Sequence, residues 1–369
     1  MAAGRIAILG AGNGGFAATV DLTLRGHVTT LWNRGEAALE PLRSGGRIWY
    51  EGVLGSGHVT APPLTTDLRE ATAGADVILV CLPAHAHAEL ARSLARHLAD
   101  GAIVVLDPGG LLGSLAFARE LRRGGFGGAL HIGETSTLTY IARKTSPAGV
   151  AITHVARDLP FAALPGDESQ ILAAGLDGVL PNLRVGRDIL EVGLASINTV
   201  LHPPAMVLAA AWIEHTGGDF YYYFDAATPS VARLMSRLDA ERLAVARAWT
   251  RDAEPFLDVF AAIGSTTREA AASGDFRRAL LESRPNRWIK APESLDHRYM
   301  REDIPCGVVP LAELGRVAGV ATPVLDAIVT ICSTSAGIDF RETGRNAEAL
   351  GIAGRSMETV LDVLLHGRP

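Results

Sequence analysis

A glycine-rich segment near the N-terminus restricts the fold of this chain more than any other feature. It contains the spacing G-x-G-x-x-G, follows the apolar run Arg5–Leu9 at once, and opens a helical segment that extends to Gly26. In that context the first glycine permits a tight turn, the second lets the backbone approach a pyrophosphate, and the third allows close packing of helix on strand. A helix N-terminus also favours phosphate. We therefore predict a dinucleotide-binding loop made of Gly10, Ala11, Gly12, Asn13, Gly14 and Gly15.

The first half of the chain alternates between short apolar runs and helical segments, a pattern typical of a parallel sheet covered on both faces. The predicted strands are Arg5–Leu9, Val28–Trp32, Asp76–Cys81, Ala102–Leu106 and Ala129–Ile132, and the predicted helices are Gly15–Arg25, His85–Leu98 and Leu112–Arg123. We expect two further strands, Gly149–Val155 and Phe161–Leu164, to extend the same sheet.

Helical patterns dominate after about Arg187. Apolar residues recur at helical spacing in Ser230–Trp249, where Pro229 precedes a predicted Ser230 cap, and Thr322-Pro323 supplies a cap and a first-position proline for another helix. We predict an α/β Rossmann-type dinucleotide-binding domain over residues 1–186, followed by an all-α C-terminal domain over residues 187–369.

Composition narrows the function class. The 369 residues are 48% hydrophobic and 20% charged, with a formal net charge of −6, so no nucleic-acid partner is expected. Three cysteines without a CxxC pattern argue against a disulfide framework and a structural zinc site, and His85 and His87 lack a third ligand in view, so no metal is expected. The uncharged stretch Val192–Ile213 contains Pro203-Pro204, which predicts a broken, buried helix and no membrane span. We expect a cytoplasmic protein; the sequence is compatible with a homodimer and does not fix the oligomeric state.

The end of the second predicted strand bears on the choice of cofactor. An NAD enzyme usually places a carboxylate there for the ribose 2′-hydroxyl, whereas this chain has Asn33-Arg34 and no carboxylate until Glu36. Arg34 can pair with a 2′-phosphate, so the sequence favours NADP(H), with NAD(H) still open. Later strand ends should line the cofactor as well, and there we expect contacts from Leu82, Pro83, His87 and Glu134.

Two polar residues interrupt the apolar stretch in the second domain. Asn198 and His202 are four residues apart, so a helix places them on one face, just before a proline break. A lone histidine in such a helix is more often a core residue, but an amide beside an imidazole makes chemistry an equal alternative. Both residues are candidates for the catalytic site.

Five ordered motifs across nearly the whole chain resemble the opine dehydrogenases, the octopine/nopaline dehydrogenase family that includes N-(1-carboxyethyl)amino-acid dehydrogenases. They are Gly10–Gly15, Gly133–Ser136, Asn198 to Pro203, Thr228–Ser230 with Asp239–Arg242, and Arg298–Pro305. The resemblance implies condensation of a 2-oxo acid with the amino group of an amino acid or amine through an imine, followed by hydride transfer from a nicotinamide cofactor.

The same resemblance assigns roles to individual residues. The family's catalytic histidine falls on His202 and its aspartate partner on Asp303, and Arg298 would reach the cofactor or a substrate carboxylate. A carboxylate bonded to one ring nitrogen fixes the tautomer and leaves the other nitrogen to exchange a proton. The alternative for Asp303 is a helix-capping carboxylate. Many relatives carry an acidic residue where this chain has Asn33-Arg34, so the family does not settle the cofactor.

Two other function classes remain open at this point. A ketopantoate-reductase-like enzyme or a 2-hydroxy-acid dehydrogenase also joins a Rossmann domain to a helical one, and several of them use a catalytic lysine. Only Lys290 is available in the helical half. A nicotinamide-binding regulatory protein without turnover is the other alternative, and the pairing of His202 with Asp303 argues against it.

Overall fold

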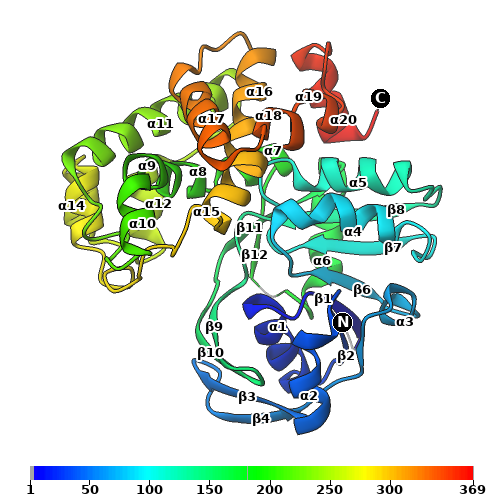
Figure 1. Ribbon diagram of the computed structural model, residues 1–369. Helices are drawn as coiled ribbons and strands as arrows, with labels where there is room; N and C mark the ends of the chain where they lie inside the picture. The colour runs from blue at the N-terminus through cyan, green and yellow to red at the C-terminus, as the bar shows by residue number, and fades with distance from the viewer. Residues whose placement is uncertain (1–3, 181, 369) are drawn as a thin grey trace. The chain divides into compact units, whose positions relative to one another are not determined.

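The computed structural model describes residues 4–180 and 182–368, which form two compact units (Figure 1). The first unit comprises Met1–Gly193 and returns at the C-terminus with Leu361–Pro369, and the second comprises Leu194–Val360. The division therefore falls seven residues after the predicted boundary at 186/187. The last residues join the α/β unit because the chain end packs there: His366 Nδ1 lies 2.6 Å from the Asp167 carboxylate.

An eight-stranded sheet with strand order β12-β11-β8-β7-β6-β1-β2-β5 is the centre of the first unit. Neighbouring strands pair in parallel except for the antiparallel β8–β11 pair, so β11 and β12 run opposite to the other six strands. β6 is buried along its whole length, as expected for a strand covered on both faces. The strands of this sheet are β1 (Arg5–Leu9), β2 (Val28–Trp32), β5 (Leu64–Thr65), β6 (Val77–Val80), β7 (Ala102–Leu106), β8 (Leu130–Thr135), β11 (Leu159–Leu164) and β12 (Leu183–Val185). The predicted parallel sheet is confirmed.

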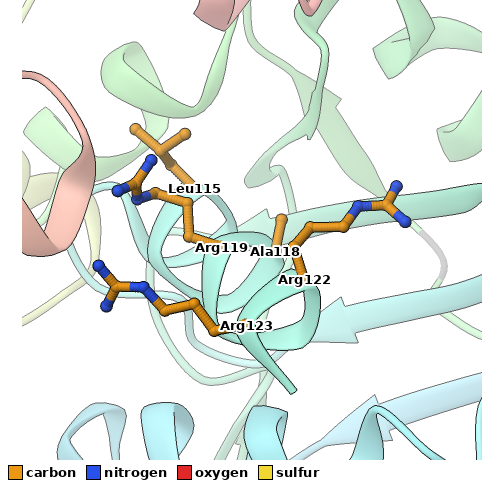
Figure 2. A pocket seen from close by; sticks show the side chains of 5 residues that line it. All are labelled: Leu115, Ala118, Arg119, Arg122 and Arg123. Atoms are coloured by element: carbon orange, nitrogen blue, oxygen red, sulfur yellow. The ribbon is translucent and has the colours of Figure 1, made fainter. Parts of the chain in front are cut away.

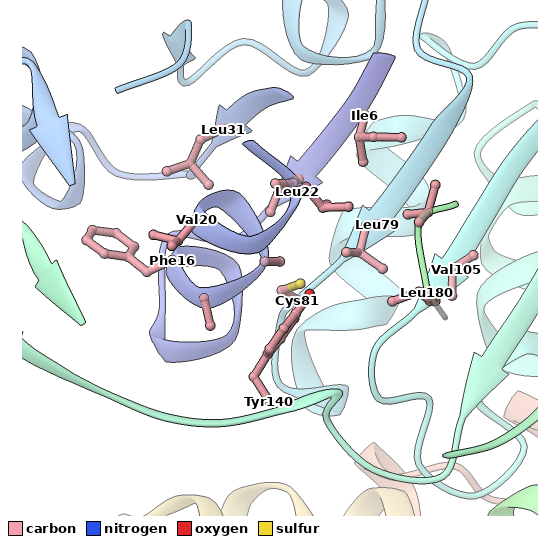
Figure 3. Close-up of a cluster of buried hydrophobic side chains, with 14 of the residues drawn as sticks. Ile6, Phe16, Val20, Leu22, Leu31, Leu79, Cys81, Val105, Tyr140 and Leu180 are labelled. Atoms are coloured by element: carbon pink, nitrogen blue, oxygen red, sulfur yellow. The ribbon is translucent and has the colours of Figure 1, made fainter. Parts of the chain in front are cut away.

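Alternate residues of each strand enter different cores. From β1, Ile6 and Ile8 join the cluster that contains α1, whereas Ala7 and Leu9 join the cluster that contains α4 and α5. Figure 3 shows the α1 cluster, with Phe16 and Val20 among its labelled side chains. The helices of this unit are α1 (Asn13–Leu24), α2 (Glu40–Gly45), α3 (Leu68–Thr72), α4 (His87–Leu94), α5 (Gly113–Arg123) and α6 (Ser169–Leu176), with short 3₁₀ turns at Glu36–Ala38, Ala84–Ala86 and Gly166–Glu168.

A second sheet of four strands corrects one prediction. Gly149–Val155 does form a strand, β10, but it pairs with β9 and β3 in the order β4-β3-β10-β9 and does not extend the main sheet. The buried side chains Ile48, Val150 and Ile152 of this sheet pack in the α1 cluster. The alternating apolar side chains of these strands pack against α1, as a strand of the main sheet could also do. Periodicity alone therefore could not tell which sheet the strands join. The remaining strands are β3 (Arg47–Gly52), β4 (Gly57–Thr60) and β9 (Tyr140–Ser146).

The regular secondary structure of the second unit's described residues is all helical apart from an isolated bridge between Tyr221 and Lys290. Its elements are α8 (Asn198–Leu201), α9 (Pro203–Leu208), α10 (Ala210–Thr216), α11 (Pro229–Ala248), α12 (Phe256–Ala262), α13 (Arg268–Ala272), α14 (Phe276–Leu281), α15 (Arg298–Arg301), the π-helix η4 (Ile304–Val308), α16 (Val309–Val317), α17 (Pro323–Ala336), α18 (Phe340–Thr343) and α19 (Ala347–Leu350). Two helices, α7 (Ile189–Leu194) and α20 (Met357–His366), span the points where the units divide.

Two predicted helix caps are wrong in detail. The cap of α11 is Thr228, whose hydroxyl accepts from Val231 N–H, and Ser230 lies inside the helix. At α17, the hydroxyl of Thr322 accepts no capping bond; the buried Glu241 carboxylate of α11 instead accepts from the N–H groups of Val324 and Leu325. A distant carboxylate replaces the local cap because α11 packs against α17.

The apolar stretch Val192–Ile213 is broken as expected. It divides into α7, α8, α9 and α10, with α9 starting at Pro203. Over residues 4–180 and 182–368, no single helix is long and apolar enough to cross a membrane, and two bent helix pairs reach that length and composition only when taken together.

Candidate functional site

The glycine loop has the backbone geometry that its sequence predicts. Gly10 has φ +121°, and a Cβ there would lie 2.7 Å from the Cys81 carbonyl oxygen. A Cβ at Gly15 would lie 1.7 Å from the Gly10 carbonyl oxygen, so only glycine lets α1 start against β1. By contrast, a Cβ at Gly12 would meet no atom within 4 Å. The backbone at Gly12 is therefore open to a ligand.

Two asparagine side chains fix this loop. Asn33, at the end of β2, accepts a hydrogen bond from Ala11 N–H at 3.2 Å and donates one to the Gly35 carbonyl at 2.9 Å. Asn13 accepts from Lys144 N–H of β9 at 2.9 Å. The predicted loop residues and Asn33 are thus brought together, although both amides bond protein backbone.

A cavity of about 470 Å³ opens at the end of β2, where a dinucleotide-binding fold places the adenosine half of its ligand. The predicted residues Asn33, Arg34, Leu82 and Pro83 line it. Glu89 of α4, which the sequence did not single out, lines it too and pairs with Arg34 at 3.0 Å, with 78% of the Arg34 side chain exposed. An exposed ion pair of this kind is weak, so Arg34 can change partner.

His87 is placed differently from its neighbour His85. His85 lines the cavity, whereas His87 is 2% exposed, its Nε2 lies 3.1 Å from the Leu82 carbonyl oxygen, and its ring meets Phe117 edge-on. The contact made by His87 therefore holds the turn after β6. No group of three or more potential metal ligands occurs among the residues that the structure describes.

Glu134 at the end of β8 is fully buried, and its Oε2 accepts from Ser114 N–H in the first turn of α5. A Cβ at Gly109 would lie 2.5 Å from the Glu134 Cβ, so Gly109 makes room for this side chain. The carboxylate accordingly stabilises the N-terminus of α5, and the predicted cofactor contact of Glu134 stays a prediction.

A second cavity, of about 310 Å³, lies on α5 and is lined by Leu115, Ala118, Arg119, Arg122 and Arg123 (Figure 2). Its arginines have structural partners. Arg122 donates to the carbonyl oxygens of Phe126 and Gly128, and Arg123 donates to Glu120 at 2.6 Å. The Arg122 bonds close the turn after α5 and the Arg123 pair lies within the helix, so we do not take this cavity as the candidate site.

The second unit brings His202 and Asp303 together across 101 residues of sequence. His202 stands at the break between α8 and α9, and Asp303 directly precedes the π-helix η4. His202 Nδ1 lies 2.6 Å from Asp303 Oδ2, and the two residues are each 7% exposed. A buried carboxylate at this distance accepts the Nδ1 proton and leaves a lone pair at Nε2.

Three tyrosines surround this pair. Tyr223 Oη lies 2.9 Å from His202 Nε2, and the Tyr223 and Tyr299 oxygens are 2.7 Å apart. The Tyr299 ring stacks on the imidazole, with centroids 3.8 Å apart and planes 17° apart, while Tyr222 donates to the His202 carbonyl oxygen at 2.7 Å. Burial raises the pKa of Tyr222 and of Tyr223 well above the ordinary value. Tyr223 and Tyr299 are not among the predicted catalytic residues; the available signal was the Tyr221-Tyr222-Tyr223 run.

The other two predicted residues of this region lie nearby in the chain. Asn198 begins α8, is half-buried, and accepts the His202 N–H on its carbonyl oxygen at 3.1 Å, which confirms that the two residues are one helical turn apart. Arg298 begins α15 and pairs with Glu302 at 3.0 Å, with 43% of its side chain exposed. The predicted role of Arg298 toward cofactor or substrate stays a prediction.

Together, the Rossmann-type unit with its glycine loop and the helical unit with a buried imidazole–carboxylate pair define an NAD(P)-dependent oxidoreductase. Comparison with known proteins gives the family. The sequence model of the NAD/NADP octopine/nopaline dehydrogenase α-helical domain matches residues 185–336, and that of ketopantoate reductase PanE/ApbA matches residues 6–120. An opine dehydrogenase from Arthrobacter sp. (strain 1C) is 34% identical over 352 residues, which cover 94% of this chain and 95% of that protein.

Solved structures agree in fold. An octopine dehydrogenase with NADH and L-arginine superposes with a TM-score of 0.78 at 19% identity, covering 99% of this chain and 98% of that one. Yersinopine dehydrogenase with NADP⁺ superposes with a TM-score of 0.72 at 15% identity, covering 98% of each chain. The chain belongs to the opine dehydrogenase family and is an NAD(P)-dependent oxidoreductase acting on CH–NH bonds, by reductive condensation of the opine type.

Proposed function

We propose that this enzyme reduces the imine formed between a 2-oxo acid and the amino group of an amino acid or amine, with His202 and Asp303 as its acid–base pair and NADPH as the preferred cofactor. The observation that carries the proposal is the 2.6 Å contact between the buried His202 Nδ1 and Asp303 Oδ2. Asn198, one turn before His202, and Arg298 are proposed as its substrate-side neighbours.

The imidazole–carboxylate pair suits the proton transfers that the reaction needs. An amino acid enters as an ammonium ion and must lose a proton before it can attack the carbonyl carbon, and the hydroxyl of the resulting carbinolamine must gain a proton to leave as water. Asp303 holds the Nδ1 proton, so His202 can accept the first proton and return the second.

Lys290, the lysine of the helical unit, supports an external amine as the source of the imine. The chain has two lysines, Lys144 and Lys290. Lys290 is exposed and pairs with Asp219 at 2.6 Å, which raises the pKa of Lys290, whereas a Schiff-base lysine needs a lowered one. Octopine dehydrogenase, a relative in fold, has been solved with L-arginine, with agmatine and with pyruvate, two amines and a 2-oxo acid.

The first unit fits a dinucleotide. The open backbone at Gly12 would hold the pyrophosphate, and the cavity at Asn33 and Arg34 would hold the adenosine half, while the reduced nicotinamide supplies the hydride. Preference for NADPH follows if Arg34 exchanges its exposed partner Glu89 for the 2′-phosphate, which carries more charge.

The test supplies NADPH or NADH with a 2-oxo acid alone, then adds amino acids and simple amines one at a time and identifies products by mass. We expect cofactor oxidation only when both organic substrates are present, with a secondary amine as product. Oxidation with the oxo acid alone, yielding a hydroxy acid, would place the protein with the hydroxy-acid dehydrogenases. Cofactor binding without oxidation across the panel would indicate a regulatory protein.

A variant assigns the acid–base role. His202→Gln keeps a hydrogen-bonding side chain but cannot exchange protons, and we expect kcat to fall by about 10²–10⁴-fold with unchanged cofactor affinity. Near-native turnover in this variant would move the proton donor away from His202 while leaving the two-substrate reaction intact.

A further inference from the structure

The catalytic nitrogen proposed for His202 already has a partner. Tyr223 Oη lies 2.9 Å from Nε2, and Tyr299 Oη lies 2.7 Å from Tyr223 Oη. Because His202, Tyr223 and Tyr299 are respectively 7%, 6% and 8% exposed, little solvent reaches this chain of groups. A substrate nitrogen cannot hydrogen bond to Nε2 along the same line while Tyr223 occupies it. Either Tyr223 moves away during turnover or it carries the proton itself.

We infer that Tyr223 and Tyr299 form a proton relay between His202 Nε2 and the substrate amine, with Tyr299 at the substrate end. The inference rests on the proposed acid–base role of His202 and adds two residues to it. Tyr223 connects the imidazole to Tyr299, and Tyr299 is the group that contacts the reacting nitrogen and oxygen.

Counting donors and acceptors fixes the direction of each hydrogen bond from Asp303 to Tyr299. With its Nδ1 proton donated to Asp303, neutral His202 offers only a lone pair at Nε2, so Tyr223 must donate to it. That uses the single proton of Tyr223, so Tyr299 must donate to the Tyr223 oxygen. When His202 is charged, each bond reverses: Nε2–H donates to Tyr223, and Tyr223 donates to Tyr299.

The two states differ by one proton and require no movement of heavy atoms. As the substrate ammonium gives a proton to Tyr299 Oη, the Tyr299 proton passes to Tyr223 and the Tyr223 proton passes to Nε2. The products are a neutral amine and an imidazolium stabilised by Asp303. After the amine has added to the carbonyl carbon, a proton of the positively charged nitrogen moves to the alkoxide oxygen and gives the neutral carbinolamine. The same transfers in reverse then protonate the carbinolamine hydroxyl. The C–O bond then breaks, water leaves, and the nitrogen lone pair forms the iminium; no electrons leave or enter the substrate in these steps.

Packing and electrostatics support transfer without an ionised intermediate. Burial, together with the neighbouring Tyr299, raises the pKa of Tyr223 well above its ordinary value, so a free phenolate there is costly and each proton must leave as the next arrives. The stacked contact between Tyr299 and the imidazole keeps the Tyr299 oxygen beside the Tyr223 oxygen.

Phenylalanine substitutions test the relay, because they remove each hydroxyl and keep the ring. We expect Tyr223→Phe and Tyr299→Phe each to lower kcat by about 10²-fold or more, within the range of general acid–base catalysis. Tyr222→Phe is the matched control: it removes a hydroxyl from the same buried cluster, but one that bonds the His202 carbonyl oxygen and not the ring. Its kcat should stay near native even if its melting temperature falls.

The pH profile separates a relay from a packing effect. The pH dependence of kcat that disappears in His202→Gln should also disappear in Tyr223→Phe and persist in Tyr222→Phe, with cofactor affinity unchanged in all three. Turnover of Tyr223→Phe equal to or faster than native would overturn the relay and show that Tyr223 only covers Nε2. The acid–base role of His202 is tested separately, because an active His202→Gln variant would contradict that role. Should Tyr223→Phe not fold, Tyr299→Phe applies the same criteria.

Discussion

Asp107 is a fully buried carboxylate that directly follows β7, and its replacement by asparagine tests how burial governs the stability of the first unit. Its Oδ1 accepts from the Thr135 hydroxyl at 3.0 Å and from Thr139 N–H at 2.9 Å, whereas no described residue hydrogen bonds to Oδ2. Burial raises the pKa of Asp107 from 3.8 to about 6, against the lowering effect of these bonds. Asparagine keeps the shape and the Oδ1 acceptor but cannot ionise.

The sign of the effect follows from the raised pKa. Between about pH 4 and pH 6 the folded protein retains a proton on Asp107 that the unfolded chain has released, so its stabilising contribution is fully present below about pH 4 and is lost as the pH rises from there through about 6. The difference between folded and unfolded pKa corresponds to about 3 kcal/mol of unfolding free energy, of which about 1.4 kcal/mol is lost between pH 5 and 7.5. Asp107→Asn should remove this loss.

Hydrogen exchange can measure the unfolding free energy of the first unit, which contains Asp107. Amides of β6 and β7 report the unfolding free energy of the first unit once intrinsic exchange rates are corrected for pH. We expect the native protein to lose about 1.4 kcal/mol more than Asp107→Asn between pH 5 and 7.5. Asp76→Asn, which removes the same charge at an exposed carboxylate, should follow the native curve. Parallel curves for native and Asp107→Asn would refute the reasoning.

Three further predictions concern the two proposed sites. Asp303→Asn should lower kcat, though by less than the roughly 10²–10⁴-fold expected on removing His202, as measured by steady-state kinetics with both substrates. An unchanged kcat would show that catalysis does not need the Asp303 carboxylate; the structure gives this side chain no capping bond at η4 that would explain it instead. Arg34→Ala should raise the KM for NADPH about tenfold and leave the KM for NADH nearly unchanged. Glu89→Gln, which frees Arg34 from its partner, should lower the KM for NADPH. A native preference for NADH would contradict the proposed role of Arg34. Gly307→Ala places a Cβ 2.6 Å from Thr199 Cγ2, so overpacking should lower the unfolding free energy by about 1–3 kcal/mol, as measured by thermal unfolding. Adding Thr199→Ser, which removes that methyl group, should restore the lost stability.

Features encoded by neighbouring residues were predicted well. Strands β1, β2 and β7 have the predicted bounds because each is a short apolar run between turn signals. The N-terminus of α17 shows where prediction from neighbouring residues stops. Thr322-Pro323 marks where the helix starts, but the capping carboxylate comes from Glu241, and only packing of α11 against α17 brings it there. For the same reason Gly149–Val155 was recognised as a strand and assigned to the wrong sheet.

The two candidate sites depend on sequence in opposite ways. The glycine loop was determined by the sequence itself, because the turn, the open backbone and the helix start arise from six consecutive residues whose glycines tolerate contacts that a Cβ would forbid. The surroundings of His202 were not determined in this way. Resemblance to a family paired His202 with Asp303, but His202 contacts Tyr223 from 21 residues away, and Tyr223 contacts Tyr299 from 76 residues away. Contacts at such separations are set by how helices pack, so only the tertiary structure decided which group faces His202 Nε2.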